Sequence, residues 1–376
     1  MPPRGRTIIH TCITLLAWVI AAATLVPAPA WLLSGTWWKA DLAANLNAQV
    51  LILAIAMGAI VAALRRWRAL IVVGVSCVLL AWPLVTHRAA YLPRAVALDA
   101  PPVQGVVRFL HYNDSSLSDK EDVYALMERS GADVLSILCP PVKMQFDVIY
   151  GHGLEDRYAG KILRPWRASP DGYATEITAA FMVSRWPIEP FDVSAAGPYS
   201  DRLIAGVVRR PEGALGVIAV HPRSPRTASR WQEGNRVIEA TVAAALRMRA
   251  AGLPVVVLSD LNSTPSGWRS RALCSGAGLA RAKPLLQATG TFPDVVRAGL
   301  SVYAPRAFAA RWPASIAIDD AVVSDGIRVV GWSTLPRLKS EHLPVGQERR
   351  EDAQGDVVAE DLGTPAQRCR LQQRHV

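Results

Sequence analysis

Acidic, amide and imidazole side chains stand at or beside the ends of several apolar, strand-like segments of this sequence. The candidate residues, together with one cysteine, are Asn113, Cys139, His221, Asp260, Asn262, Asp319, Glu341 and His342. A positioned carboxylate can orient or deprotonate a water molecule, while imidazoles and a divalent cation can neutralise charge on an anionic phosphate under attack. Because α/β sheets place their ligand sites at the carboxyl ends of strands, we expect these side chains to converge on one site.

Each candidate also has an ordinary structural interpretation. Asn113 and Asp319 could be turn or cap residues, and His221 could simply end a strand. Asp260 and Asn262 could form an Asx turn that leads into a helix. Taken together at the ends of several strands, the residues favour a shared site over a series of unrelated turns.

Strand-like and helix-like segments follow one another from residue 105 onward. Apolar and β-branched runs predict strands over 105–111, 132–138, 179–184, 203–209, 214–221, 254–260, 318–324, 327–332 and 342–345. Helical spacing of apolar residues predicts helices over 119–130, 230–250 and 267–273. This order predicts an α/β domain over 104–345, preceded by a proline-containing linker over 89–103. Residues 346–376 are polar and aperiodic, which predicts a flexible tail.

Seven short segments of this domain carry its polar candidates in a recognisable order. They are HYN (111–113), DVLSILC (133–139), AVHPRSP (219–225), SDLNSTP (259–265), GTFP (290–293), AIDDAVVSDG (317–326) and SEHLPV (340–345). In this order they resemble the endonuclease/exonuclease/phosphatase family, which includes deoxyribonuclease I-like nucleases, inositol-phosphate phosphatases and sphingomyelinases. SDLNSTP is the most specific match. The resemblance implies a four-layered α/β sandwich, with two mixed β-sheets flanked by helices, and metal-assisted hydrolysis of a phosphoester.

The resemblance also implies roles for individual residues. Asp260 would orient or deprotonate the attacking water, and Asn262 would hold that water or a phosphoryl oxygen. His342 would stabilise the charge that develops on phosphorus, with Asp319 fixing its imidazole. His221 would donate a hydrogen bond to a non-bridging oxygen.

The expected metal site departs from the family pattern. Where the family has a glutamate that binds Mg²⁺, this chain has Cys139, and Glu341 stands where Asp is usual. Asp320 likewise stands where many members have His. The resemblance places Asn113 beside the metal together with Glu341. Because Mg²⁺ requires oxygen ligands, the cysteine predicts weaker binding of a divalent cation, Mg²⁺ or Mn²⁺, or a preference for a softer ion such as Mn²⁺ or Zn²⁺.

Two interpretations of the domain follow from these departures. It could be a divalent-cation-dependent phosphoester hydrolase of reduced activity, or a catalytically inactive binding or sensing module. Retention of Asp260, Asn262, Asp319 and His342 favours the hydrolase. Cys139 could instead be a small buried residue or a disulfide partner.

The N-terminal third predicts a membrane anchor over residues 1–88. Residues 7–38, 42–64 and 69–86 contain no Asp, Glu, Lys or Arg, which predicts transmembrane helices near 8–26, 43–64 and 69–86. The basic residues on one side of the three spans are Arg4, Arg6, Arg65, Arg66 and Arg68, and those on the other side are Lys39, Arg88 and Arg94. The positive-inside rule therefore predicts a multi-pass protein of the cell (inner) membrane, with a cytoplasmic N-terminus and an extracytoplasmic C-terminal domain. A cleaved signal peptide would leave that domain on the same side.

Charge and motif content exclude several other classes of protein. Residues 1–100 carry 8 Lys and Arg against 2 Asp and Glu, so more than half of the net charge of +10 lies in the apolar third, and nucleic acid is a possible but not an indicated partner. No GxSxG, GxxxxGK[ST] or HExxH motif is present. The expected partners are the membrane and a phosphoester of open class. Oligomeric state and any disulfide among Cys139, Cys274 and Cys369 stay open.

Overall fold

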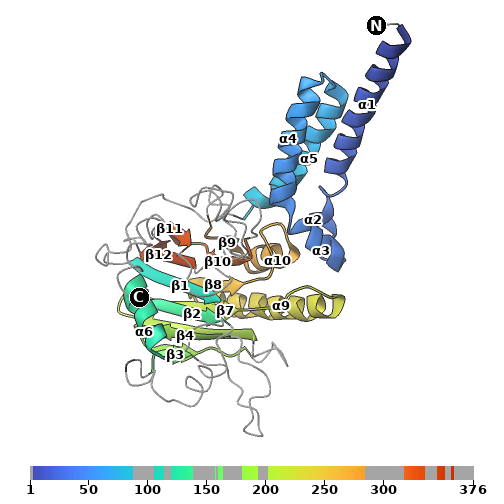
Figure 1. Cartoon of the computed structure of the whole chain (residues 1–376). Helices are drawn as coiled ribbons and strands as arrows, with labels where there is room; N and C mark the ends of the chain where they lie inside the picture. The colour runs from blue at the N-terminus through green and yellow to red at the C-terminus, as the bar shows by residue number, and fades with distance from the viewer. Residues whose placement is uncertain are drawn as a thin grey trace. The chain divides into compact units, whose positions relative to one another are not determined.

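The computed structural model in Figure 1 divides the chain into two compact units. It describes residues 3–87, 106–113, 120–138, 157, 160–163, 180–193, 202–283, 317–334, 345–351 and 357–359. One unit combines Met1–Thr86 with Ser263–Arg271, and the other combines His87–Asn262 with Ala272–Val376. The predicted linker over 89–103 lies outside the described residues.

Helices make up the N-terminal part of the first unit. They are α1 (Pro3–Leu25), α2 (Ala30–Leu33), α3 (Trp38–Ala44), α4 (Asn47–Ala63) and α5 (Trp67–Val85). Two helical stretches, Ile8–Leu33 and Trp67–Val85, are individually long and apolar enough to cross a membrane. The helices α3 and α4 are bent by 57° relative to one another, and they provide a third crossing only if the bent pair forms a single span. Of the helix predicted near 43–64, residues 47–63 form α4, whereas its first residues belong to α3 and to the bend between the two helices.

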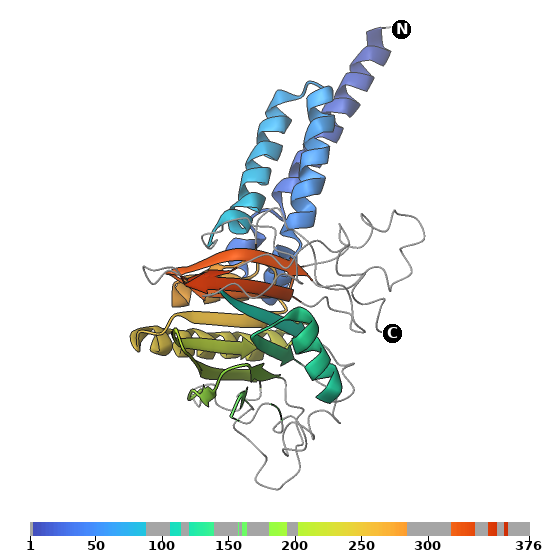
Figure 2. The same ribbon diagram turned by 90° about the vertical axis from the view of Figure 1, so that its left-hand side faces the viewer.

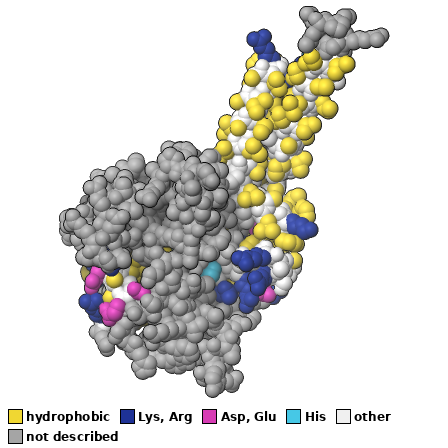
Figure 3. Space-filling view, in the orientation of Figure 1, with side chains coloured by type: hydrophobic (Ala, Val, Ile, Leu, Met, Phe, Trp, Pro, Cys, Tyr) yellow, Lys and Arg dark blue, Asp and Glu magenta, His cyan; other side chains and the backbone are white. Residues whose placement is uncertain are grey.

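Small side chains allow these helices to pack closely, while larger apolar side chains face outward. Ala17, Ala21, Val61, Ala69 and Val73 form a buried cluster between α1, α4 and α5. Figure 3 shows hydrophobic side chains over the outer surface of these helices. More than half exposed are Leu15, Val19, Ile55, Ile71 and Val78. An apolar outer surface of this kind suits a hydrocarbon environment better than water.

The second unit contains two mixed β-sheets. The seven-stranded sheet has the order β11-β13-β12-β1-β2-β4-β3, and the six-stranded sheet has the order β5-β6-β7-β8-β10-β9. The strands of the first sheet are β1 (Val106–Asn113), β2 (Val134–Leu138), β3 (Ile162–Leu163), β4 (Ala180–Ser184), β11 (Ile327–Thr334), β12 (Val345–Glu351) and β13 (Val357–Ala359). Those of the second are β5 (Ile188–Pro190), β6 (Leu203–Arg210), β7 (Gly213–Val220), β8 (Val255–Asp260), β9 (Leu279–Arg281) and β10 (Asp319–Ser324).

The main core lies between the two sheets. It joins Phe109 and Val134 of the seven-stranded sheet to Val217, Val256 and Leu258 of the six-stranded sheet in one cluster of buried side chains. Strands buried on both faces read as continuous apolar runs, which is why 254–260 has no polar alternation. The core therefore fixes the ends of strands from both sheets relative to one another.

Helices cover the outer faces of the sheets. The helix α6 (Lys120–Ser130) packs Val123 and Met127 against Leu135 of β2, and α9 (Ala228–Ala250) contacts β6, β7 and β8. Figure 2 shows α6 in front of the strands and α9 behind them. The structure thus confirms an α/β fold with two mixed sheets and flanking helices.

The described part of the predicted tail is not structureless. β12 pairs antiparallel with β1, with Val106 opposite Arg350, and β13 pairs with both β11 and β12. The prediction of a flexible tail from residue 346 is wrong for these segments. Their polar sequence gives no strand signal because main-chain hydrogen bonds to neighbouring strands, rather than an apolar pattern, hold them in place.

Candidate active site

Strand geometry brings the polar candidates to one edge of the sandwich. β8 is buried throughout and ends at Asp260, and its parallel neighbour β7 ends one residue before His221. β10 runs antiparallel to β8 and pairs Asp319 with Asp260. From the other sheet, β1 ends at Asn113. The strand ends that carry these polar side chains therefore lie together at one edge of the sandwich.

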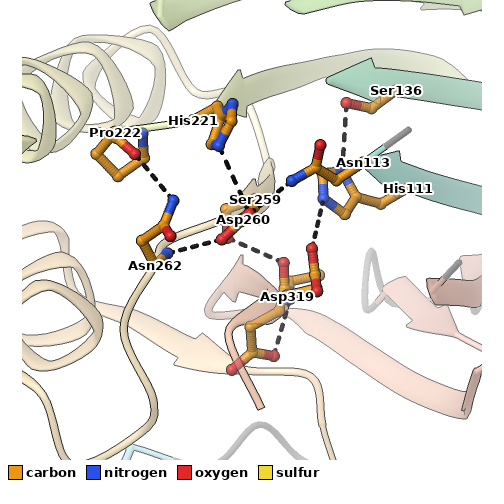
Figure 4. A network of polar contacts seen from close by, with 11 residues as sticks. His111, Asn113, Ser136, His221, Pro222, Ser259, Asp260, Asn262 and Asp319 are labelled. Carbon is orange, nitrogen blue, oxygen red and sulfur yellow. Dashed lines mark hydrogen bonds and ion pairs between the residues drawn. The ribbon is translucent and has the colours of Figure 1, made fainter. Parts of the chain in front are cut away.

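Asp260 is the centre of a buried hydrogen-bond network (Figure 4). Its Oδ2 accepts a hydrogen bond from Asn113 Nδ2 at 2.6 Å and lies 3.5 Å from His221 Nε2. Its Oδ1 accepts from the backbone N–H of Asn262 at 2.7 Å. The Asp260 side chain is 1% exposed, and these donors fill part of the hydrogen-bonding capacity of the buried carboxylate. The network holds the carboxylate in one orientation.

Asn262 has a backbone conformation that few residues adopt. Its φ is 48°, in the left-handed region, where asparagine is tolerated better than most residues with a Cβ. Its Nδ2 donates to the carbonyl oxygen of Pro222 at 3.1 Å, and Pro222 follows His221. The loop after β8 is therefore tied to the loop after β7.

His111 lies within the same region, although its role was not anticipated from the sequence. Its Nε2 is 3.8 Å from Asp319 Oδ1, and its Nδ1 is 3.4 Å from Ser136 Oγ. Residues two apart in a strand project to the same face, so its position two residues before Asn113 in β1 was the available signal. His111 is 1% exposed and lies beside Asp319.

Further charges are buried behind the candidate site. Asp320 is 2% exposed and its Oδ1 accepts a hydrogen bond from the N–H of Ala321 at 2.8 Å. Burial lowers the pKa of Arg281, an effect that the negative charge of Asp320 partly opposes. Asp320 is thus engaged with β9 and β10.

The structure brings together five of the eight predicted site residues. Asn113, His221, Asp260 and Asn262 share one hydrogen-bond network, and Asp319 pairs in register with Asp260. The remaining three, Cys139, Glu341 and His342, lie outside the described residues. Their roles therefore stay predictions.

The described residues do not complete a cation site. Among them, no group of three or more His, Cys, Asp or Glu side chains is arranged to hold a metal ion. Both oxygens of Asp260 accept hydrogen bonds from protein donors, and Asn113 turns its nitrogen, not its oxygen, toward that carboxylate. The described residues alone therefore do not complete a site for a divalent cation.

Two face-to-face mixed sheets with outer helices, and a buried Asp–Asn–His network at their strand ends, define an α/β sandwich with a candidate active site at one edge. Residues 103–342 match the model of the Endonuclease/Exonuclease/phosphatase family, and the chain belongs to this family. Members of the family are phosphoesterases and generally use divalent cations. None of the curated proteins matches the sequence.

Several solved structures are similar to the chain at low identity. An endonuclease/exonuclease/phosphatase from Beutenbergia cavernae DSM 12333 is 15% identical, with a TM-score of 0.43 over 67% of this chain and 76% of the other. A mannosyl-6-phosphatase from Bacteroides thetaiotaomicron VPI-5482 is 12% identical, with a TM-score of 0.44 over 64% and 98% of the two chains. TDP2 of D. rerio, complexed with a single-strand DNA product, is 12% identical, with a TM-score of 0.43 over 65% and 98%.

Proposed function

We propose that this protein is a membrane-anchored hydrolase of phosphoester bonds. The observation that carries the proposal is the orientation of Asp260, whose two oxygens are held by Asn113 and by the backbone of Asn262 beside His221. Membership of a family of phosphoesterases supports the same reaction class. The substrate is a phosphodiester or phosphomonoester of open class.

Each residue of the network has a role that its chemistry allows. Asp260 accepts a hydrogen bond from the attacking water and so orients it, since its own position is fixed before substrate binds. His221 Nε2, 3.5 Å from Asp260 Oδ2, donates to a phosphoryl oxygen when protonated. Asn262, which is hydrogen-bonded both to Asp260 and to the carbonyl oxygen of Pro222, holds the water or a phosphoryl oxygen.

The remaining roles follow from family membership and involve His342, Glu341 and Cys139, which lie outside the described residues. His342 stabilises the charge on the phosphoryl group, with Asp319 as the partner of its imidazole. A divalent cation, Mg²⁺ or Mn²⁺, is expected beside Asn113 and Glu341, and Cys139 in place of the usual carboxylate is expected to weaken its binding.

Contacts within the helical unit support the proposed arrangement in the membrane. Arg66, in the turn between α4 and α5, places its Nη1 2.9 Å from Nε2 of His10 in α1. The basic turn over 65–68 and the start of α1, with Arg4 and Arg6, therefore lie at the same end of the helices. The positive-inside rule then assigns this end to the cytoplasm, with the catalytic domain on the extracytoplasmic side of the inner membrane.

The test is hydrolysis by the full chain in lipid nanodiscs. Bis-p-nitrophenyl phosphate and p-nitrophenyl phosphate would be assayed with Mg²⁺, with Mn²⁺ and with EDTA, comparing wild type, Asp260→Ala and Asp325→Ala. Asp325 is an exposed carboxylate after β10 and provides a matched control for Asp260. We expect activity that EDTA removes, that Asp260→Ala lowers by about 10²-fold or more, and that Asp325→Ala leaves unchanged.

The opposite result is equally informative. A wild type that is inert toward both substrates in every metal, or an Asp260→Ala variant as active as wild type, would show that the network is not catalytic. Binding of a phosphoester without turnover would then identify the domain as a binding module.

A further inference from the structure

The segment that follows the candidate catalytic loop belongs to the helical unit. Ser263–Arg271 is grouped with Met1–Thr86, although Asn262, the residue before it, belongs to the other unit. The polypeptide therefore passes directly from a predicted catalytic residue into contacts with the helical unit. These contacts are polar, buried and made by two residues of one short helix region.

Asp41 of α3 binds the beginning of α10 (Trp268–Ala277). Its Oδ1 accepts a hydrogen bond from the backbone N–H of Trp268 at 2.7 Å, and the Asp41 side chain is fully buried. The first N–H groups of a helix have no partner within that helix and favour a negative charge. Asp41, which is 227 residues earlier in the chain, thus caps the N-terminus of α10.

Asn45, at the end of α3, binds the segment nearer to the catalytic loop. Its Oδ1 accepts from the backbone N–H of Thr264 at 2.6 Å and from Thr264 Oγ1 at 3.1 Å. Ser263 Oγ lies 3.4 Å from the same oxygen. Asn45 therefore fixes the two residues that directly follow Asn262.

Two further features show that this contact is built closely. Gly267 leaves room for Ser263 and for both acceptors, because a Cβ there would lie closest to Ser263 Oγ, then 2.6 Å from Asn45 Oδ1 and 3.2 Å from Asp41 Oδ1. Arg271 reaches back toward α2, where its Nη2 donates to Trp31 O at 2.5 Å and also to Ser34 Oγ. Acceptors thus come from α3 and a donor goes to α2, so the segment is held from both directions.

We propose that Asp41 and Asn45 are positioning residues for the catalytic loop, so that the membrane anchor forms part of the active-site support. This inference rests on the proposed function. The N–H of Asn262 donates a hydrogen bond to Asp260. The N–H of Thr264, two residues later, donates a hydrogen bond to Asn45. The left-handed backbone of Asn262 is fixed between these two hydrogen bonds.

The energetics explain why such residues occur in an otherwise apolar anchor. Burying a carboxylate without a partner is strongly unfavourable, so Asp41 is tolerated there because it has donors in the 263–271 segment. A displacement of the reacting groups by about 1 Å can cost roughly 10²-fold in rate. Loss of either acceptor should therefore lower turnover even though neither residue belongs to the site.

The test compares variants of the full chain in nanodiscs. Asp41→Ala and Asn45→Ala should lower kcat by roughly 10- to 100-fold while KM changes by about twofold or less. Asp41→Asn should restore most of kcat, because its amide oxygen can still accept from Trp268. Asn47→Ala is the matched control, since Asn47 is a buried amide at the start of α4 whose Nδ2 has no hydrogen-bond partner among the described residues.

Hydrogen exchange gives a second readout that does not depend on activity. In Asp41→Ala the amide of Trp268, and in Asn45→Ala the amide of Thr264, should exchange faster than in wild type, while amides of β7 and β8 keep their protection. A folded variant in which the amides of β7 and β8 also lose their protection would indicate general destabilisation and would overturn a positioning role.

The outcomes separate this inference from the proposed function. An active wild type whose Asp41→Ala and Asn45→Ala variants keep full kcat would overturn the positioning role alone. A wild type inert in every metal would overturn the proposed function and, with it, the catalytic meaning of these contacts. If Asp41→Ala does not fold, Thr264→Val and Asp41→Asn apply the same comparison with smaller changes.

Discussion

Asn113 and Asp260 join the two β-sheets through a 2.6 Å hydrogen bond, although they are 147 residues apart. Asn113 ends β1 of the seven-stranded sheet, and Asp260 ends β8 of the six-stranded sheet. The amide nitrogen donates to a carboxylate that is 1% exposed. A charge-assisted hydrogen bond in such a place is stronger than a neutral one, so it sets both the packing of the sheets and the orientation of Asp260.

Removing this donor should impair stability and turnover together. In Asn113→Ala the buried Asp260 oxygen loses a partner, which should lower the free energy of unfolding by about 1–3 kcal/mol. The carboxylate is then free to turn, so kcat should fall as well. Urea denaturation and hydrolysis of bis-p-nitrophenyl phosphate measure the two effects. Equal stability and equal kcat in the variant would show that the hydrogen bond is incidental.

Much of this framework could be predicted from the sequence because its strands are buried. The strands at 203–210, 213–220 and 255–260 fall within two residues of their predicted ranges, since continuous β-branched runs leave few alternatives. The short strands β3, β5 and β9 were missed because two or three residues carry no periodic pattern. β12 was missed because hydrogen bonds to β1 hold a polar segment in the sheet.

Some features of the site and of the anchor could be predicted from the sequence and others could not, and the difference has physical reasons. Polar residues at strand ends indicated Asn113 and Asp260 correctly as neighbours, because sheet topology alone brings strand ends together. The contact of His111 with Asp319 depends on side-chain packing between sheets, which no local pattern reports. The bend between α3 and α4 was missed because Asn45 occurs within an uninterrupted stretch without charges.

Asp133 should make stability depend on pH. Burial raises the pKa of Asp133 more than the N–H of Arg108 and the charges of nearby arginines lower it. A carboxyl group whose pKa is higher in the folded than in the unfolded state stabilises the fold below the unfolded pKa. That contribution disappears as pH rises through the folded pKa.

The matching variant is Asp133→Asn, which keeps an acceptor for the Arg108 N–H at 2.8 Å but carries no charge. Relative to wild type, the free energy of unfolding of this variant should increase as pH rises from about 4 toward neutral. Urea denaturation of the full chain at several pH values measures the difference. A difference that stays constant, or that favours wild type as pH rises, would mean that the arginines outweigh burial.

Cys139→Glu should strengthen the response to Mg²⁺. The resemblance to the family places this residue where a glutamate usually binds the metal, and carboxylate oxygens suit Mg²⁺ better than a thiol. We expect the Mg²⁺ concentration for half-maximal activity to fall by roughly 10-fold or more, since even changes to groups that only support metal ligands alter affinity on that scale. Cys274→Ala is the control at another cysteine. An unchanged Mg²⁺ dependence would show that residue 139 does not approach the metal.

The proposed topology predicts opposite behaviour for two reporters at residue 95. Alkaline phosphatase fused there should be active, and a fluorescent protein that matures only in the cytoplasm should stay dark, because the basic residues Arg65, Arg66 and Arg68 hold the other end of the helices inside. The same fusions at residue 66 should give the reverse pattern. A fluorescent fusion at residue 95 would place the catalytic domain in the cytoplasm.

Gly267→Ala tests the closeness of the contact between α3 and the 263–271 segment. The added Cβ would lie closest to Ser263 Oγ and 2.6 Å from Asn45 Oδ1, so the variant should displace both oxygens, disturb the hydrogen bond from the Thr264 N–H and lower kcat by roughly 10-fold. In an Asn45→Ala background the same change should cost less, because one of the two obstructing oxygens is already gone. A double-mutant cycle on kcat measures this coupling. Additive effects of the two substitutions would mean that Gly267 and Asn45 act independently on the loop.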